Sequence, residues 1–199
     1  MKLFVNPTSP YVRIVRMAIV EKGLAGEIEL VPVDAWADAP DFLDANPAGR
    51  VPALVTEDGT RICEAFLILH YLDGSRPQTP VLPAGPDAAR VLSRAGLAVA
   101  IFDAAVEVVI ARKSAPDFDG HMVGRKRFRT MRDGLARLDR EWPEGGTEGL
   151  DFAGMAAVTA LDYLVFRFTD EDWRGIAPRI AAFRDAQADR ASVKDTAPA

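Results

Sequence analysis

The residues best suited to chemistry in this sequence lie in two short stretches that could hold a peptide through backbone groups. Proline cannot donate to a sheet ladder, so Pro52 belongs at the start of a strand, where a cis bond would turn the backbone of Val51 toward an open groove. Glu64 and Ala65 open an apolar helix, whose first N–H groups lack partners and attract a carboxylate. A backbone edge beside an anion site suits a short acidic peptide.

Three polar side chains near these groups have plain structural interpretations. Ser9 precedes Pro10, which is well placed at the first position of a helix, so Ser9 is a suitable helix cap. Glu64 is a favourable acid in a first helical turn, because it complements the helix dipole. Arg50 follows a glycine turn and is expected to be exposed. The residues alone leave these interpretations open beside a functional one.

The elements that position these residues form a thioredoxin-like pattern. A strand at 2–5, a helix from Ser9 to Gly23 and a strand at 27–33 make a βαβ unit, which implies a parallel, right-handed crossover. Helical turns at 40–46 come next. They are followed by a hairpin that ends at Cys63 and by the helix at 64–73. We therefore expect a small sheet with helices on both faces over residues 1–75.

The second half of the chain is expected to be a helical bundle. Proline and glycine break up residues 76–86, which we interpret as a linker between two domains. Helical periodicity then dominates residues 87–199. The expected helices cover residues 87–113, 120–141, 151–168 and 178–189.

Composition excludes several classes of function. The net charge of −5 gives no general attraction to nucleic acid or to an anionic membrane, although residues 125–132 carry a basic run that we interpret as a solvated helix face. The longest apolar stretches are interrupted by charges, so no membrane span is expected. The single cysteine, Cys63, and the two distant histidines predict no disulfide and no metal site. The start of the chain is too broken for a secretory signal, which favours the cytoplasm.

Three motifs in order give the chain a resemblance to the soluble glutathione transferases, bacterial members included. They are Thr8-Ser9-Pro10-Tyr11-Val12-Arg13, then Asn46-Pro47-Ala48-Gly49-Arg50-Val51-Pro52-Ala53-Leu54, then Glu64-Ala65-Phe66-Leu67-Ile68-Leu69-His70-Tyr71-Leu72. The closing segment from Arg190 to Pro198 is also similar to the tail of bacterial members. The resemblance implies a thioredoxin-like domain followed by an all-helical domain, with glutathione as co-substrate and no metal.

The resemblance also implies roles for particular residues. Ser9 would contact and activate the glutathione sulfur, as a serine, tyrosine or cysteine does in many members. Val51 would pair with the cysteinyl backbone of glutathione, and Arg50 could reach its glycine carboxylate. Glu64 and Ala65 would hold the γ-glutamyl end. The family usually has serine where this chain has Ala65, so the backbone donor is kept and a hydroxyl is lost.

The expected reaction is conjugation of the glutathione thiolate to a small apolar electrophile, a detoxification chemistry. Its pocket would lie between the two domains, and the candidate wall residues are Tyr11, Phe102, Val106 and Phe166. Apolar residues at helical spacing are core more often than pocket, so this alternative stays open. Family members are usually homodimers, and we expect the same here.

Two other functions compete with conjugation. The missing hydroxyl at Ala65 makes a non-catalytic relative plausible, one that kept the fold as a ligand-binding or protein-interaction module. A glutathione-dependent isomerase or disulfide reductase is a weaker alternative. The isomerases typically carry a Ser-Ser-Cys start, and the disulfide-exchanging members have cysteine where this chain has Ser9.

Overall fold

The computed structural model describes residues 1–144 and 149–198, and the chain divides into two compact units. Unit 1 comprises Met1–Leu82 together with the closing segment that begins at Arg190, and unit 2 comprises Pro83–Asp189. The expected order, a thioredoxin-like domain followed by a helical region, is confirmed. The position of the closing segment differs from the expectation. We expected it in a helical domain of residues 87–199, whereas it packs with the N-terminal residues.

Unit 1 is built on a four-stranded mixed sheet. The strands are β1 (Lys2–Val5), β2 (Glu29–Pro32), β3 (Ala53–Val55) and β4 (Arg61–Cys63). Their order is β2-β1-β3-β4, with β1 parallel to β2 and the other pairs antiparallel. The parallel pair confirms the crossover that the helix between β1 and β2 predicts.

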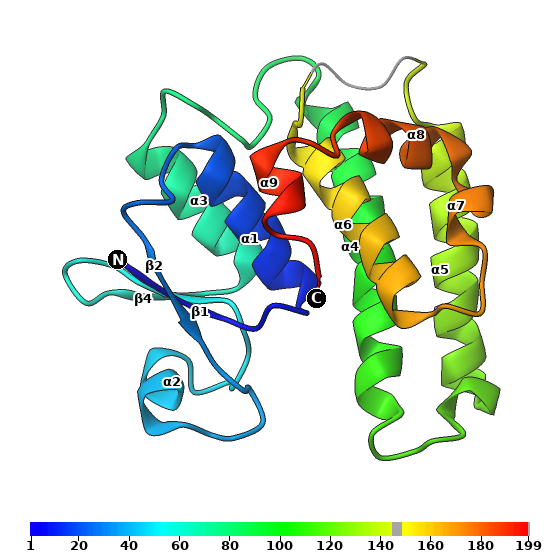
Figure 1. Cartoon of the computed structure of the whole chain (residues 1–199), viewed down its shortest axis with the longest axis horizontal. Helices are drawn as coiled ribbons and strands as arrows, with labels where there is room; N and C mark the ends of the chain where they lie inside the picture. The colour runs from blue at the N-terminus through cyan, green and yellow to red at the C-terminus, as the bar shows by residue number, and fades with distance from the viewer. Residues whose placement is uncertain (145–148, 199) are drawn as a thin grey trace. The chain divides into compact units, whose positions relative to one another are not determined.

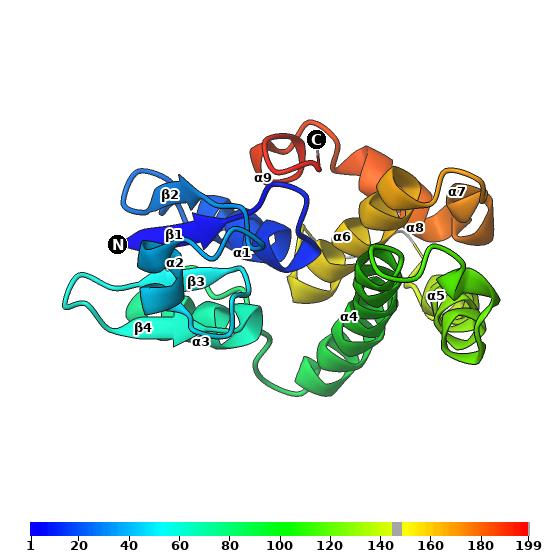
Figure 2. The same cartoon turned by 90° about the horizontal axis from the view of Figure 1, so that it is seen from below.

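Helices cover both faces of this sheet. α1 (Pro10–Glu21) and α3 (Ala65–Ser75) lie on one face and α2 (Pro40–Ala45) lies on the other (Figure 1). Apolar residues of α1 are buried at helical spacing, which confirms the expected core face. On the other face, Phe42 of α2 packs on Phe4 of β1 with ring centroids 5.8 Å apart. α9 (Ala191–Lys194), which the sequence did not predict, lies beside α1 in two views (Figures 1 and 2).

Unit 2 is helical throughout its described elements. It contains α4 (Ala88–Ala111), the 3₁₀ turn η1 (Phe118–Gly120), α5 (Met122–Arg140), α6 (Phe152–Arg167), α7 (Trp173–Ile176) and α8 (Pro178–Ala186). α4 packs against both α5 and α6. Asp151 caps α6, because its side chain accepts the backbone N–H of Gly154 at 2.7 Å. The four-residue α7 was not predicted.

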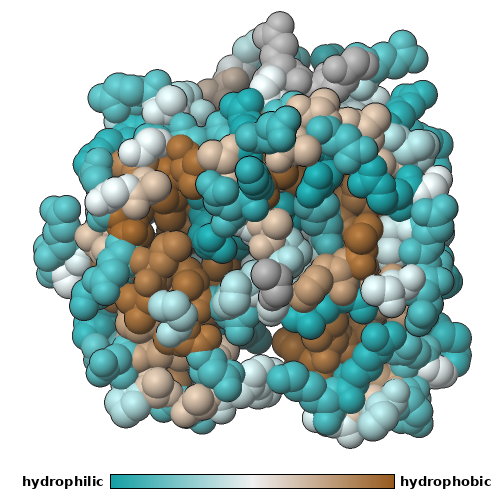
Figure 3. All heavy atoms as spheres, viewed as in Figure 1, coloured by the Kyte–Doolittle hydropathy of each residue, from teal (hydrophilic) through white to brown (hydrophobic). Residues whose placement is uncertain are grey.

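The surface of the two units carries separate apolar areas among hydrophilic side chains, as the face in Figure 3 shows. The most exposed large apolar side chains are Trp36 and Leu67 in unit 1 and Met122 in unit 2. Of the helices that the structure describes, none has both the length and the apolar character needed to span a membrane.

Candidate functional site

Three chain segments meet at one end of the sheet because of the strand register. Phe4 of β1 pairs with Ala53 at the start of β3, and Ala53 pairs with Cys63 at the end of β4. The chain that leaves β1 therefore enters α1 at the same end of the sheet where the Val51–Pro52 bond leads into β3 and where β4 passes into α3. The register brings together the backbone edge and the two helix starts that the sequence singled out.

The hydroxyl of Ser9 is poised to donate a hydrogen bond. Ser9 is the half-buried cap of α1, and its Oγ accepts the backbone N–H of Val12 at 3.3 Å. That bond uses a lone pair of Oγ, so the hydroxyl hydrogen can be donated to a ligand. The neighbouring hydroxyl of Thr8 differs, because it already lies 2.9 Å from Oδ1 of Asn6. Ser9 is therefore the better placed donor at the start of α1.

Asn46 organises the turn that leads into β3. Its side-chain amide donates to the carbonyl of Arg50 at 2.7 Å, and Gly49 adopts a φ of 63°, which glycine tolerates without strain. The Val51–Pro52 peptide bond is cis, which confirms the expectation from the sequence. Val51 precedes the first paired residue of β3, so its backbone lies outside the sheet ladder. The side chain of Arg50 is exposed.

Glu64 holds an uncommon backbone conformation at the start of α3. Its φ of 68° and ψ of 125° lie where residues other than glycine are rarely found, at a cost of about 1–3 kcal/mol. Its carbonyl accepts the N–H groups of Leu67 and Ile68, at 3.1 and 3.0 Å, and its side chain is exposed. Ala65 is 2% exposed and is the first residue of the helix, so no earlier turn of α3 supplies an acceptor for its backbone N–H.

Cys63 next to this helix is not an activated thiol. It is half-buried, and its Sγ lies 3.7 Å from the carbonyl oxygen of Ala45. Burial, followed by the carboxylate of Glu64, raises the pKa of the Cys63 thiol. The thiol therefore stays protonated near neutral pH. Across residues 1–144 and 149–198, no group of three or more His, Cys, Asp or Glu side chains could hold a metal ion.

The residues expected to line the second-substrate pocket are divided between the units. Tyr11 is half-buried in α1 of unit 1. Phe102 and Val106 belong to α4 and Phe166 to α6, all in unit 2. Phe102 is fully buried, whereas Val106 and Phe166 are half-buried. The pocket itself stays a prediction.

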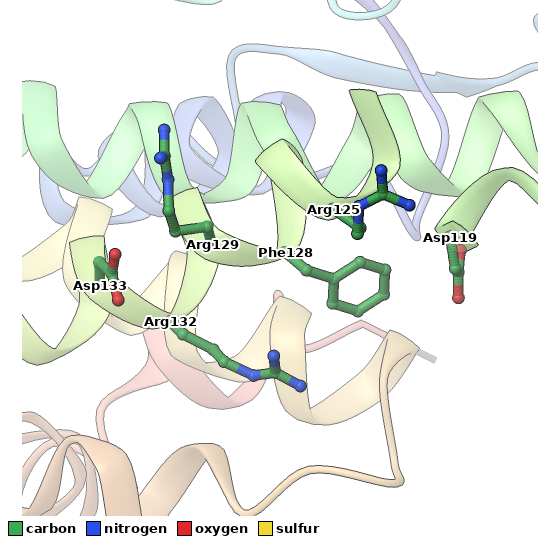
Figure 4. A pocket seen from close by; sticks show the side chains of 6 residues that line it. All are labelled: Asp119, Arg125, Phe128, Arg129, Arg132 and Asp133. Atoms are coloured by element: carbon green, nitrogen blue, oxygen red, sulfur yellow. The ribbon is translucent and has the colours of Figure 1, made fainter. Parts of the chain in front are cut away.

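A separate hollow of about 400 Å³ opens on α5 in unit 2. Its lining residues are Asp119, Arg125, Phe128, Arg129, Arg132 and Asp133 (Figure 4). Arg112 binds Asp119 with its Nε at 2.9 Å, and Arg132 pairs with Glu171, so two of the lining charges are compensated locally. Arg125, Lys126 and Arg129 are exposed, which confirms that this basic run forms a solvated helix face. The hollow contains none of the predicted site residues.

Comparison with known proteins places the chain in a family. Residues 8–75 match the model of the glutathione S-transferase N-terminal domain. Over all of its length the chain is 30% identical to the uncharacterized GST-like protein YibF of Escherichia coli, of which it covers 98%. The chain belongs to the glutathione S-transferase family.

Two other proteins resemble the chain to a similar degree. FtsZ-localized protein A of Caulobacter vibrioides is 30% identical, with 84% of this chain and 78% of that protein covered. A glutathione S-transferase of Methylobacterium radiotolerans, solved in complex with glutathione sulfonate, superposes with a TM-score of 0.87 at 30% identity. That comparison covers 99% of this chain and 94% of the other.

All of the glutathione-contacting residues inferred from the sequence fall within the matched glutathione S-transferase domain. Two features of this region were missed by sequence reasoning. The strained backbone of Glu64 has no sequence signal, because positive φ is expected at glycine rather than at glutamate. The role of Asn46 could have been found, because Asn before Pro favours a turn that the asparagine side chain stabilises.

Proposed function

We propose that this member of the glutathione S-transferase family conjugates the thiolate of glutathione to a small, apolar electrophile. The observation that carries the proposal is the position of Ser9. Its hydroxyl hydrogen can be donated at the N-terminus of α1, at the same end of the sheet as Val51 and the start of α3. A hydroxyl donor and a helix N-terminus both favour an anion over its neutral acid.

The required change in thiol ionisation is within reach of these groups. A free thiol has a pKa near 8.5, so only about 3% of it is ionised at pH 7. Lowering that pKa by about 2 units makes roughly three quarters of it thiolate and needs ~2.7 kcal/mol of differential stabilisation. One charge-assisted hydrogen bond contributes about 1.5–3 kcal/mol, and the helix terminus adds to it. The hydroxyl of Ser9 and the N-terminus of α1 together could therefore stabilise the thiolate by the required amount.

The rest of glutathione would be held mainly by backbone groups. The N–H and C=O of Val51 would pair with the cysteinyl part, and the first N–H groups of α3 with the γ-glutamyl carboxylate. The side chain of Glu64 would accept a hydrogen bond from the γ-glutamyl ammonium group, and Arg50 would donate one to the glycine carboxylate. Ala65 lacks the hydroxyl common in the family. This loss weakens binding by about 0.5–1.5 kcal/mol, or up to tenfold, without abolishing it.

The electrophile would bind beside the glutathione sulfur, and Tyr11 of α1 is the candidate residue of unit 1 to contact it. The enzyme would then gain rate by supplying thiolate and by holding both reactants together. Family relationship further leads us to propose a cytoplasmic homodimer with a role in detoxification. Sedimentation velocity at several protein concentrations tests the dimer.

Calorimetric titration with glutathione at pH 7 is the decisive experiment. We expect binding accompanied by proton release, measured by repeating the titration in buffers of different ionisation enthalpy. S-methylglutathione is the matched control, because it has no thiol proton to release. Turnover of a panel of electrophiles follows on the same protein. Absence of glutathione binding would refute the proposal outright.

A non-catalytic ligand-binding or protein-interaction module is the second candidate, and Ala65 is the residue that favours it. The alanine removes one ligand-contacting hydroxyl while leaving the fold unchanged. Glutathione binding without proton release, and without conjugation of any electrophile in the panel, would favour this candidate over conjugation.

A further inference from the structure

The closing segment of the chain, residues 190–198, is docked along α1. Ser192 and Val193 are fully buried and Thr196 is 1% exposed, although the segment is short and near the end of the chain. α9 contacts α1 and belongs to unit 1 with it. Segments near chain ends are poorly ordered unless they are tied down. Burial of these side chains therefore indicates that the segment packs specifically against α1.

Polar contacts anchor this closing segment at three levels of α1. At the end of the helix, Glu21 accepts two bonds of 2.8 Å from Arg190 and a further one from Ser192. In the middle, Arg16 donates to the carbonyl of Asp195 at 2.8 Å. In the first turn of the helix, Arg13 makes the third set of contacts. The segment is thus fixed along the whole length of α1, the helix that Ser9 caps.

Arg13 is the contact nearest to the candidate catalytic hydroxyl. It is only 3% exposed, with Nη2 3.4 Å from the carbonyl of Val193 and Nε 3.5 Å from Oγ1 of Thr196. Thr196 in turn donates to the carbonyl of Ser192 at 2.6 Å, which fixes its hydroxyl. The backbone N–H of Arg13 donates to the carbonyl of Ser9 at 3.0 Å. Arg13 and Ser9 are therefore joined through the first turn of the helix.

We propose that Arg13 is a positioning residue for Ser9. It ties the first turn of α1 to residues 193–196 and so holds the Ser9 hydroxyl where the glutathione sulfur binds. This inference rests on the proposed conjugation for its catalytic consequence. Its structural part, that Arg13 restrains the first turn, does not depend on glutathione. Catalytic hydrogen bonds lose much of their effect when the donor is misplaced by about 1 Å, because the electrostatic stabilisation depends on geometry.

The experiment compares Arg13→Met with Arg16→Met. Both variants remove one guanidinium that contacts the closing segment, but only Arg13 lies in the turn that carries Ser9. The first readout is the pH midpoint of thiolate formation in the glutathione complex, followed by ultraviolet absorbance. We expect Arg13→Met to raise this midpoint by about one unit, a tenfold loss of thiolate at lower pH, with glutathione affinity changed by less than about threefold. Arg16→Met should leave the midpoint unchanged.

The second readout is amide hydrogen exchange of residues 12–15 without glutathione. Exchange should be faster in Arg13→Met than in wild type, and it should be nearly unchanged in Arg16→Met. If Arg13→Met does not fold, Arg13→Lys and Thr196→Val replace it in both measurements. Each weakens the contact between Arg13 and Thr196 and keeps a side chain of similar volume, which is polar in Arg13→Lys and apolar in Thr196→Val.

Equal effects of the two methionine variants, or an unshifted midpoint in Arg13→Met, would overturn the inference. If wild type binds no glutathione, the proposed conjugation fails. The exchange measurement then still decides whether Arg13 restrains the first turn, because unchanged exchange in Arg13→Met refutes that part by itself.

Discussion

Replacing Ser9 by alanine should have two effects of different size, and the structure allows each to be estimated. The first is loss of the helix cap. The Oγ of Ser9 accepts the N–H of Val12 at 3.3 Å, a long bond, so the cost is near 1 kcal/mol rather than at the upper end for caps. In a chain of 199 residues this lowers the melting temperature by about 2–4 °C. The protein should therefore remain folded under assay conditions.

The second effect is on turnover. Loss of one charge-assisted hydrogen bond to the thiolate costs about 1.5–3 kcal/mol, which corresponds to a tenfold or greater fall in conjugation rate near neutral pH. The deficit should shrink at higher pH, because the thiol then ionises without help. The assay is the rate of conjugation of an aryl chloride activated by nitro groups, measured at saturating glutathione over a range of pH. A parallel shift of the profile to higher pH is the expected signature.

Two variants separate the cap from the chemistry. Thr8→Ala is the matched control, since the Thr8 hydroxyl is 2.9 Å from Asn6 Oδ1, and its removal should change the rate by less than about twofold. Ser9→Gly removes the hydroxyl but costs the cap only a few tenths of a kcal/mol, so it should lose turnover with little loss of stability. Unchanged turnover in Ser9→Ala would refute the reasoning and move the role to Thr8 or Tyr11.

Three further predictions concern the stability of the two units. Gly124→Ala should destabilise the protein by about 1–3 kcal/mol in urea denaturation, because a Cβ there would lie 2.0 Å from the carbonyl oxygen of Phe118. An unchanged unfolding free energy would mean that η1 can move away from the added methyl group at no cost. Asp139→Ala should cost a similar amount, about 1–3 kcal/mol by thermal denaturation, because the buried carboxylate accepts two backbone N–H groups at the start of α8, at 2.8 and 2.9 Å; glutathione affinity should not change. Hydrogen bonds from Arg190 hold the pKa of Glu21 below its ordinary 4.5, so this group stabilises the fold above pH 4.5 and loses its contribution as pH falls through the folded-state pKa. Glu21→Gln should flatten the acid limb of a plot of unfolding free energy against pH, and an identical limb in both proteins would argue against this linkage.

The arrangement of unit 1 was largely predictable because its signals are local. Pro52 restricts where β3 can begin, and Ser9 with Pro10 determines the start of α1. A helix between two short apolar strands leaves a parallel crossover as the simplest connection. These constraints come from single residues and from near neighbours in sequence, so a single sequence is enough to reveal them.

The features that were missed depend on contacts distant in sequence. The segment from Arg190 looks like a polar tail, and only its pairing with Glu21, 169 positions earlier, shows that it belongs to unit 1. Lys22 is a similar case, because its buried ammonium binds Asp73 at 2.8 Å and two carbonyls of the linker. Neither pairing has a periodicity or a spacing that a sequence can display. The strain at Glu64 likewise arises from the junction of β4 with α3 and not from its residue type.

The distribution of backbone and side-chain groups at the site explains why the alanine at position 65 need not end glutathione binding. In the proposed complex, Val51 would offer its backbone from outside the sheet ladder and α3 would offer the backbone N–H at its start, and neither group depends on the side chain present at position 65. The strained φ of Glu64 has a rationale in the same terms. Glu64 lies at the junction between β4 and α3, and a cost of about 1–3 kcal/mol would be tolerable there if the backbone itself binds the ligand, as proposed. In the proposed mechanism, side-chain chemistry is concentrated at Ser9, and that residue, more than Ala65, would decide between conjugation and binding alone.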